Sequence, residues 1–316
     1  MIKLAANWQY LLVSQIARGK YFMRPDLAIA LTGQATDLIL AKNGTTAEKR
    51  RIELTRVSLL DNGLFQRKSF YLDEDDEDED METTSSIYDD APSGSVAIIP
   101  LKGSMMKYGT WCDYGTNDLA AMVMDAVNHK NIGAIVLDID SGGGAVDAVA
   151  PMVHAIDAAK SAGKPIVASV DMACSAAYWV ASECNAIVAD NSISSEVGSI
   201  GVMMSFMDAT KYYEEKGITL HSIYSNHSSG KNESFRLALE GKYDMIKEED
   251  LDPLAVAFQN TVRRNRAGKL DESTPGMLSG KTFFGEAALK TGLIDHLGDN
   301  RTAINLALGM SHAKQL

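Results

Sequence analysis

Short apolar runs alternate with amphipathic stretches over most of the chain beyond residue 95. β-Branched apolar runs predict strands at residues 96–100, 132–139, 165–170, 186–189 and 220–224. Apolar positions at helical spacing predict helices at residues 117–128, 148–162, 175–182 and 247–266, and a last strand and helix at 293–308. Because strands that are apolar on both faces alternate with helices, we expect an α/β fold with a mostly parallel sheet and flanking helices.

The pattern before residue 73 is different. Apolar residues recur at helical spacing near the start (Leu4, Trp8, Leu11, Leu12 and Ile16), and more loosely over residues 27–31. This segment carries 11 Lys and Arg against 5 Asp and Glu, so its net charge is 11 − 5 = +6. We therefore predict a separate helical N-terminal region over residues 1–72.

A block of eight consecutive acidic residues follows, from Asp73 to Asp80. Like charges at this density repel one another and cannot be buried in a core. Pro92 and Gly94 follow in a stretch rich in small and polar residues. The sequence therefore predicts an acidic disordered linker over residues 73–94.

Charge, cysteine content and the length of apolar runs exclude several classes of protein. The 316 residues carry a net charge of −12, which argues against nucleic acid as the main partner. Cys112, Cys174 and Cys184 are too few and too irregularly spaced for a disulfide framework or a zinc site, and they fit a reducing cytoplasm. No apolar run has the length of a targeting signal or a membrane span. We expect a soluble cytoplasmic protein without a metal or a cofactor.

Three turns of small residues follow predicted strands, where open α/β sheets place their ligand sites. The first contains Gly142, Gly143 and Gly144, which let the backbone approach a ligand and point N–H groups at it. A phosphate-binding loop is the rival interpretation, but the run lacks both the P-loop and the dinucleotide patterns. A plain turn is also compatible with these three residues alone.

The second turn places Ser175 between a strand and a helix. A serine there lies at the positive end of the helix, and the adjacent N–H of Ala176 can face a developing oxyanion. Taken alone, the commoner role of such a serine is to cap the helix. The third turn, Gly198-Ser199-Ile200-Gly201-Val202, would by itself fit a bulge or the edge of a hairpin.

Together the three turns resemble the S49 peptidase family, which includes signal peptide peptidase A and phage head-maturation proteases. That family has Ser-Pro-Gly-Gly, then Ala-Ser-Gly-Gly-Tyr-Tyr-Ile-Ala-Ser, then Gly-Ser-Ile-Gly-Val. This chain has Ser-Gly-Gly-Gly at 141–144, Cys-Ser-Ala-Ala-Tyr-Trp-Val-Ala-Ser at 174–182 and Gly-Ser-Ile-Gly-Val at 198–202. Gly142 replaces the usual proline, and Ala176 and Ala177 replace glycines, all exchanges between small residues. The resemblance implies a ClpP/crotonase-like S49 peptidase domain over residues 95–310.

A serine nucleophile requires a base. No histidine occurs between His154 and His221, so a Ser-His-Asp triad is disfavoured. The resemblance implies instead a Ser-Lys dyad, with a lysine some 50 residues after the serine. Lys231 lies 231 − 175 = 56 residues downstream and is the preferred base, with Lys242 and Lys211 as alternatives. Cys174 is a rival nucleophile, but its position fits a small buried residue better.

The resulting hypothesis is a serine endopeptidase with Ser175 as nucleophile and Lys231 as base. The N–H groups of Gly143 or Gly144, and of Ala176, would hold the oxyanion, and Ser199 would orient the lysine or line the groove.

The resemblance further implies a homo-oligomeric ring and a protein or peptide substrate. A phage or prophage head-maturation protease that cleaves scaffold and capsid proteins, in the host cytoplasm or inside proheads, fits best. The N-terminal region would then dock to the capsid or be removed by self-cleavage. The alternatives are a soluble signal-peptide-peptidase-like protease that degrades cytoplasmic peptides, a structural head protein without activity, and a crotonase-type enzyme of coenzyme A thioesters.

Overall fold

The protein is seen in a computed structural model, and the structure describes residues 20–23, 51–59, 65–73, 86–109, 114–206, 208, 210–219 and 221–313. Its strands are β1 (Lys20–Met23), β2 (Arg51–Leu59), β3 (Phe65–Asp73), β4 (Ser95–Lys102), β5 (Ile132–Ser141), β6 (Gly143–Ala145), β7 (Ile166–Cys174), β8 (Ala186–Ala189), β9 (Glu196–Gly198), β10 (Met203–Met204), β11 (Thr282–Phe284) and β12 (His296–Leu297). Its helical segments are α3 (Thr116–Asn128), η1 (Val146–Ala148), α4 (Val149–Ser161), α5 (Ala176–Glu183), α6 (Thr210–Glu215), α7 (Glu233–Leu239), η2 (Ile246–Leu251), α8 (Asp252–Asn265), α9 (Gly285–Lys290) and α10 (Asn300–Ala313).

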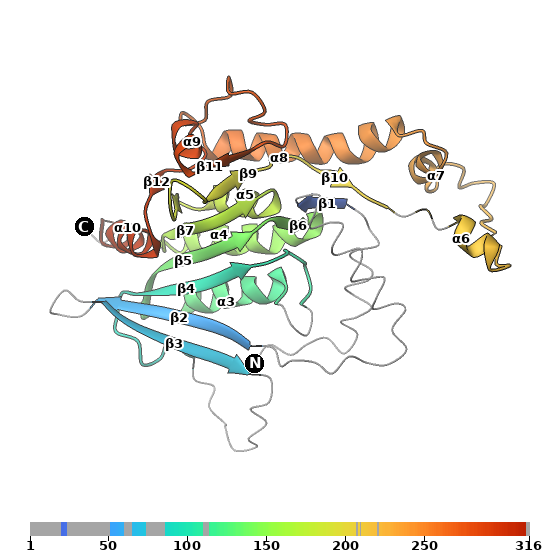
Figure 1. Ribbon diagram of the computed structural model, residues 1–316. Helices are drawn as coiled ribbons and strands as arrows, with labels where there is room; N and C mark the ends of the chain where they lie inside the picture. Colours follow the sequence, from blue (N-terminus) through green and yellow to red (C-terminus); the bar gives the residue numbers. More distant parts are fainter. Residues whose placement is uncertain are drawn as a thin grey trace, which may run out of the picture.

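Within the described residues the larger sheet has nine strands and is mostly parallel (Figure 1). Its main path runs β11-β9-β7-β5-β4-β2-β3, and β12 and β8 branch from β7. Strands β4, β5, β7, β8, β9 and β12 form parallel pairs, whereas β2, β3 and β11 pair antiparallel. Strand β7 pairs with β8 through its first half and with β9 through its second half, so the sheet divides close to the end of β7.

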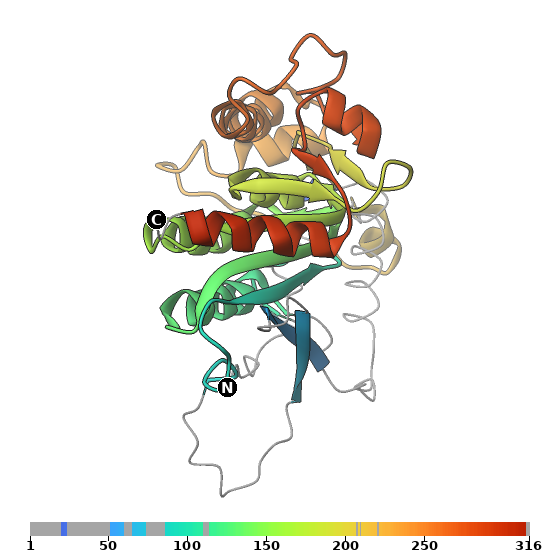
Figure 2. The same cartoon turned by 90° about the vertical axis from the view of Figure 1, so that its left-hand side faces the viewer.

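Helices cover both faces of the sheet, as the apolar strand runs require. Helices α3, α4 and α5 pack on one face through a core that includes Met122, Ile156 and Tyr178. Helix α10 covers the other face with Ile304 and Leu308 (Figure 2). The side chains of β5 from Ala134 to Leu137 point alternately to the two faces of the sheet, and all are fully buried. Both faces of the sheet must therefore be covered. The expected α/β class, with a mostly parallel sheet and flanking helices, is therefore confirmed.

The helical expectation for residues 1–72 is wrong where the structure describes that segment. Residues 20–23, 51–59 and 65–73 form strands, and β2 pairs with β4 as part of the larger sheet. Asn62-Gly63, a common hairpin signal, separates two β-prone runs that pair as β2 and β3. The helical spacing of residues 4–16 and 27–31 lies outside the described residues, and the domain boundaries stay a prediction.

The end of the expected linker is ordered and packed. Tyr88 is 1% exposed, and the buried Arg56 on β2 donates hydrogen bonds to the carbonyl of Ile87 (3.0 Å) and to the carboxylate of Asp90 (2.6 Å). Burial raises the pKa of Tyr88. The prediction of disorder is therefore wrong for residues 86–94, because apolar and paired side chains interrupt the acidic composition there. Residues 74–85 lie outside the described part of the chain.

The region after the third turn extends away from the sheet. Residues 221–224 form no strand, contrary to expectation. The expected long helix at 247–266 is present as η2 and α8, and it leads outward to α7 and α6 (Figure 1). We call residues 206–251, described without residues 207, 209 and 220, the arm. The helices of the described residues include none that is long and apolar enough to cross a membrane.

Candidate active site

Ser175 occupies a sharp turn between β7 and α5. Its backbone has φ 56° and ψ −119°, a conformation that costs free energy for a residue with a side chain. Although Ser175 stands at the N-cap position of α5, its side chain makes no capping hydrogen bond. A plain capping role therefore does not explain this serine. α/β-Hydrolases present a nucleophilic serine on a strained strand-to-helix turn of this kind.

The third turn lies directly beside Ser175. β9 pairs with the end of β7, which brings Cys174 opposite Gly198. The Ser175 N–H donates to the carbonyl of Gly198 (2.8 Å), and its hydroxyl donates to the carbonyl of Gly201 (3.4 Å). Main-chain groups of the glycine turn therefore fix both the backbone and the hydroxyl of the serine.

Backbone geometry explains the residue types of this turn. Gly198 has φ 111°, and a Cβ atom there would lie 2.8 Å from the carbonyl oxygen of Lys281. Ser199 has φ 53°, and its N–H donates to the same carbonyl at 2.9 Å. The neighbouring strand β11 thus supports the turn, and Ser199 is half-buried beside Ser175.

The first turn forms β6 and reaches the same edge of the sheet. The register of β5 and β7 places Ser141 beside Ala173, and β6 contacts α5. A Cβ atom on Gly144 would lie 1.8 Å from the carbonyl oxygen of Met105, so only glycine fits there. The Gly143 N–H donates to the hydroxyl of Ser141 (3.2 Å).

Hydrogen bonds with Met105 set the direction of the amides of β6. The Met105 N–H donates to the carbonyl of Gly143 (2.9 Å), and the Ala145 N–H donates to the carbonyl of Met105 (2.8 Å). Because successive peptide groups of a strand point to opposite sides, the Gly144 N–H points away from Met105. Of the two glycines expected to hold the oxyanion, Gly143 donates its N–H to Ser141, whereas Gly144 directs its N–H away from Met105. Ala176 opens α5, so its N–H has no acceptor in a preceding helical turn.

Packing behind the turn holds α5 in place. The buried Tyr178 hydroxyl donates to the carbonyl of Leu293 (2.9 Å), and burial raises the pKa of Tyr178. The Trp179 ring stacks on Phe258 of α8, with centroids 4.8 Å apart and planes 12° apart. The sequence motif contains both aromatic residues, but the partners on distant elements could not be read from it.

The candidate lysines lie elsewhere in the chain. Lys231 is exposed in the loop before α7, and its N–H donates to the carbonyl of Ser228 (3.1 Å). Lys242 pairs with Glu240 (2.7 Å), and Lys211 is exposed on α6. Figure 1 shows α6 and α7 at the far end of the arm, well apart from α5 and β7. The structure therefore brings together the serine and the three turns, but not the lysines of the same chain.

Two other groups do not compete with Ser175. Cys174 is fully buried, with its Sγ 3.9 Å from the carbonyl oxygen of Glu196. His154 lies exposed on α4. Cys174 thus packs as a small apolar residue, in agreement with the interpretation preferred from the sequence.

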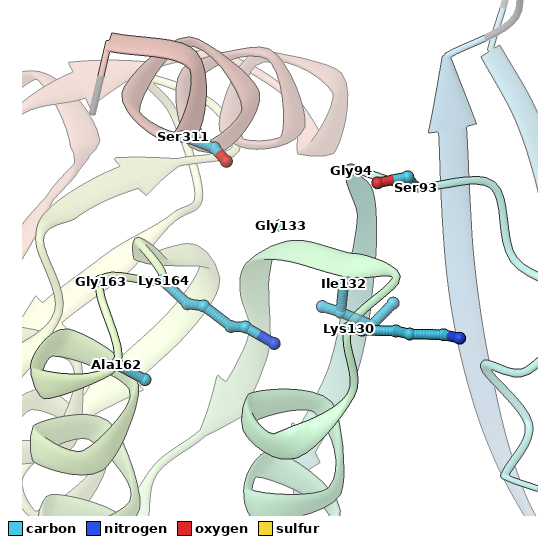
Figure 3. Close-up of a pocket in the computed structure, with 9 residues that line it drawn as sticks. All are labelled: Ser93, Gly94, Lys130, Ile132, Gly133, Ala162, Gly163, Lys164 and Ser311. Atoms are coloured by element: carbon cyan, nitrogen blue, oxygen red, sulfur yellow. The ribbon is translucent and has the colours of Figure 1, made fainter. Parts of the chain in front are cut away.

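A pocket lies at the opposite end of the parallel strands (Figure 3). It is lined by Ser93, Gly94, Lys130, Ile132, Gly133, Ala162, Gly163, Lys164 and Ser311. Lys164 reaches toward the turn that opens β5 and donates to the carbonyls of Ala126 (3.0 Å) and His129 (2.6 Å), which end α3. Burial lowers the pKa of Lys164. β5 separates this pocket from the Ser175 turn by roughly 30 Å.

Comparison with known proteins shows which family and which relatives the chain is similar to. Residues 158–314 match the family model described as Peptidase family S49. Protease 4 of Salmonella typhi is 29% identical over 70% of this chain and 35% of its own length. The head-tail preconnector protein GP5 of Enterobacteria phage P21 is 27% identical over 67% of this chain and 42% of its own length.

Among solved structures, the S97A mutant of the 1510-N membrane-bound stomatin-specific protease aligns with a TM-score of 0.38 and 15% identity. This alignment covers 69% of this chain and 84% of that one.

The strand-turn-helix at Ser175 and its glycine turns place a serine beside glycine-rich main chain at one edge of an α/β sheet. Through residues 158–314 the chain matches peptidase family S49. The family resemblance drawn from the three turns is therefore confirmed. The chain spans less than half the length of the two relatives described above.

Proposed function

We propose that this chain is a serine endopeptidase in which Ser175 attacks the peptide carbonyl. The main support for this proposal is the strained turn at Ser175. The turn presents a hydroxyl that does not cap helix α5 and that lies beside two glycine turns. We assign the oxyanion to the N–H groups of Gly144 and Ala176, the former after it gives up its pairing with β1. The peptide C–N bond would then break as the amine leaves with the proton taken from Ser175, and water would hydrolyse the acyl-enzyme and free the serine.

The proposed base is Lys231 of a neighbouring copy of this chain, so that two copies complete a Ser-Lys dyad. Phe258 anchors α8 against α5, and twelve residues of helix (258 − 246) separate it from Ile246, roughly 18 Å farther along the arm. Lys231 belongs to the loop before α7, which packs against η2 at that outer end. A lysine acts as a base only when neutral, a state that desolvation at a subunit junction favours.

Exposed apolar side chains on the arm and on α8 support an oligomer. They are Phe206, Tyr212, Tyr213, Ile218, Ile223, Phe235, Leu239, Tyr243 and Val256. Large apolar side chains gathered on a projecting segment are typical of surfaces that bind another protein. A second copy is the proposed partner, because the arm carries the candidate lysines and its own Ser175 lies out of their reach.

The biological setting proposed is head maturation in a phage or prophage, with scaffold or capsid proteins as substrates. The similarity to a phage head-tail preconnector protein supports this setting. The similarity to Protease 4 supports the proposed peptidase activity but does not indicate which substrate is cleaved. The proposed location is the host cytoplasm or the interior of proheads.

Labelling the purified full-length chain with a fluorophosphonate probe tests the proposal. Mass spectrometry should find the label on Ser175, and Ser175→Ala should abolish it. Ser182→Ala is the matched control, because the Ser182 hydroxyl donates to the carbonyl of Trp179 and should not react. If the assembled oligomer stays unlabelled, a structural head protein becomes the better interpretation. Co-expression with a capsid or scaffold protein then tests the substrate, since processing should require Ser175.

A further inference from the structure

Strand β1 lies between the two glycine turns of the candidate site. It is the central strand of a three-stranded sheet with the order β10-β1-β6, and it runs antiparallel to both neighbours. Its register pairs Tyr21 with Ala145 on one side and with Met203 on the other. Figure 1 shows β1 beside β6 and β10, although it comes from the start of the chain.

Both neighbours of β1 belong to the site. β6 is the first glycine turn, and β10 begins two residues after Gly201, whose carbonyl accepts the Ser175 hydroxyl bond. β1 also contacts α5, the helix that starts directly after Ser175. A short piece of the N-terminal region thus spans the gap between the segments that flank the serine.

The register shows which group β1 covers. Gly144 is paired with Phe22, and the peptide groups of Gly144 point away from Met105, toward β1. The Gly144 N–H is the group to which the proposed function assigns the oxyanion. Main chain of this protein's own N-terminal segment therefore faces the group that a substrate carbonyl would need.

We propose that residues 20–23 are a pseudosubstrate strand, which holds in cis the position that an extended substrate backbone takes between β6 and β10. This inference rests on the proposed peptidase function. Extended peptides bind exposed strands through main-chain hydrogen bonds, so any substrate must compete for the same backbone groups. A tethered competitor has a high effective concentration, of the order of millimolar, so peptidase activity stays low until β1 leaves.

Phe22→Pro in the full-length chain tests the proposal. Proline has no N–H and cannot pair within a central strand, whereas Phe22→Leu keeps the main chain and is the matched control. If β1 fills the groove about 90% of the time, the fluorophosphonate labelling rate of Ser175 should rise about tenfold in Phe22→Pro and stay unchanged in Phe22→Leu. Equal rates in a folded Phe22→Pro variant would overturn the inference.

A reversible lock tests the same contact without breaking the strand. Because Phe22 and Gly144 form the hydrogen-bonded pair, Tyr21 and Ala145 form the closer pair, with Cα atoms about 4.5 Å apart, which suits a disulfide. In the double variant Tyr21→Cys/Ala145→Cys, oxidation should abolish labelling and reduction should restore it. The single variant Tyr21→Cys should not respond to oxidation.

The outcomes separate the two proposals. If the Ser175 labelling rate is the same in Phe22→Pro and in the oxidised Tyr21→Cys/Ala145→Cys variant as in the wild type, the pseudosubstrate proposal is overturned. The proposed peptidase function is then unaffected. The absence of Ser175 labelling in every variant, reduced and oxidised, overturns the peptidase and the pseudosubstrate together.

Discussion

The Ser175 hydroxyl lies 3.4 Å from the carbonyl oxygen of Gly201, and within the described residues this main-chain group is its hydrogen-bond partner. A carbonyl can orient the hydroxyl but cannot accept its proton during an attack. The serine therefore has its position within one chain but still needs a base. The lysines of the arm are the candidates for this base.

A mixing experiment shows whether the base comes from another copy. Ser175→Ala and Lys231→Ala should each be inactive alone. Mixed and reassembled, they should recover about a quarter of the wild-type activity if copies combine at random around a head-to-tail ring. Lys242→Ala, which removes another exposed lysine of the arm, should remain active alone. Verified mixing without recovery would show that Lys231 is not supplied in trans.

Gly144→Ala should impair the site through backbone displacement. The added Cβ would lie 1.8 Å from the carbonyl oxygen of Met105, so β6 must shift. A shift of about 1 Å at a catalytic group costs on the order of 100-fold in rate, which Ser175 labelling kinetics would detect.

Gly309→Ala is the matched control, because a Cβ atom on this glycine of α10 meets nothing within 4 Å. It should keep full reactivity and stabilise the protein by about 0.5–1 kcal/mol through the helix preference of alanine. Retention of full labelling by Gly144→Ala would remove Gly144 from the site.

Asp295→Asn should destabilise the fold strongly. Arg266, 3% exposed, donates to both carboxylate oxygens of Asp295 at 2.8 and 3.1 Å, and the substitution leaves this cation buried without its partner. Loss of one member of a buried pair costs about 3–5 kcal/mol, measurable by urea unfolding. Glu286→Gln, which breaks the exposed pair with Lys290, is the control and should leave the free energy of unfolding almost unchanged. Equal effects would contradict the structural role of the buried pair.

The same carboxylate should make stability depend on acidity. Burial alone would raise the pKa of Asp295, but hydrogen bonds from Arg266 and Lys269 outweigh it and lower the pKa from 3.8 to about 2. A lowered pKa stabilises the folded protein above pH 4, and this contribution is lost as pH falls from about 4 to about 2. Its size is on the order of 2 kcal/mol. Asp295→Asn should remove this part of the pH dependence in unfolding titrations between pH 2 and 5.

The α/β core and the three turns could be predicted from the sequence because each depends on local pattern. Continuous apolar runs indicated β4, β5, β7 and β8, and glycines marked turns that need φ values such as that of Gly198. The missed strands β2 and β3 have less regular apolar spacing, and the antiparallel pairing with β4 that stabilises β2 is not local. Pairing of Gly144 with Phe22 likewise joins segments 122 residues apart (144 − 22), which a residue pattern does not reveal.

The pairing of β2 with β4 bears on what happens if the backbone is cut between residues 74 and 85. The two pieces would share one sheet, through the pairs Thr55–Ile98, Arg56–Ala97 and Val57–Val96 and through the Arg56–Asp90 ion pair. We expect a nicked protein to run as two bands on a denaturing gel and to elute as a single species under native conditions. A cleavage there would change the connectivity of the protein without releasing its N-terminal part.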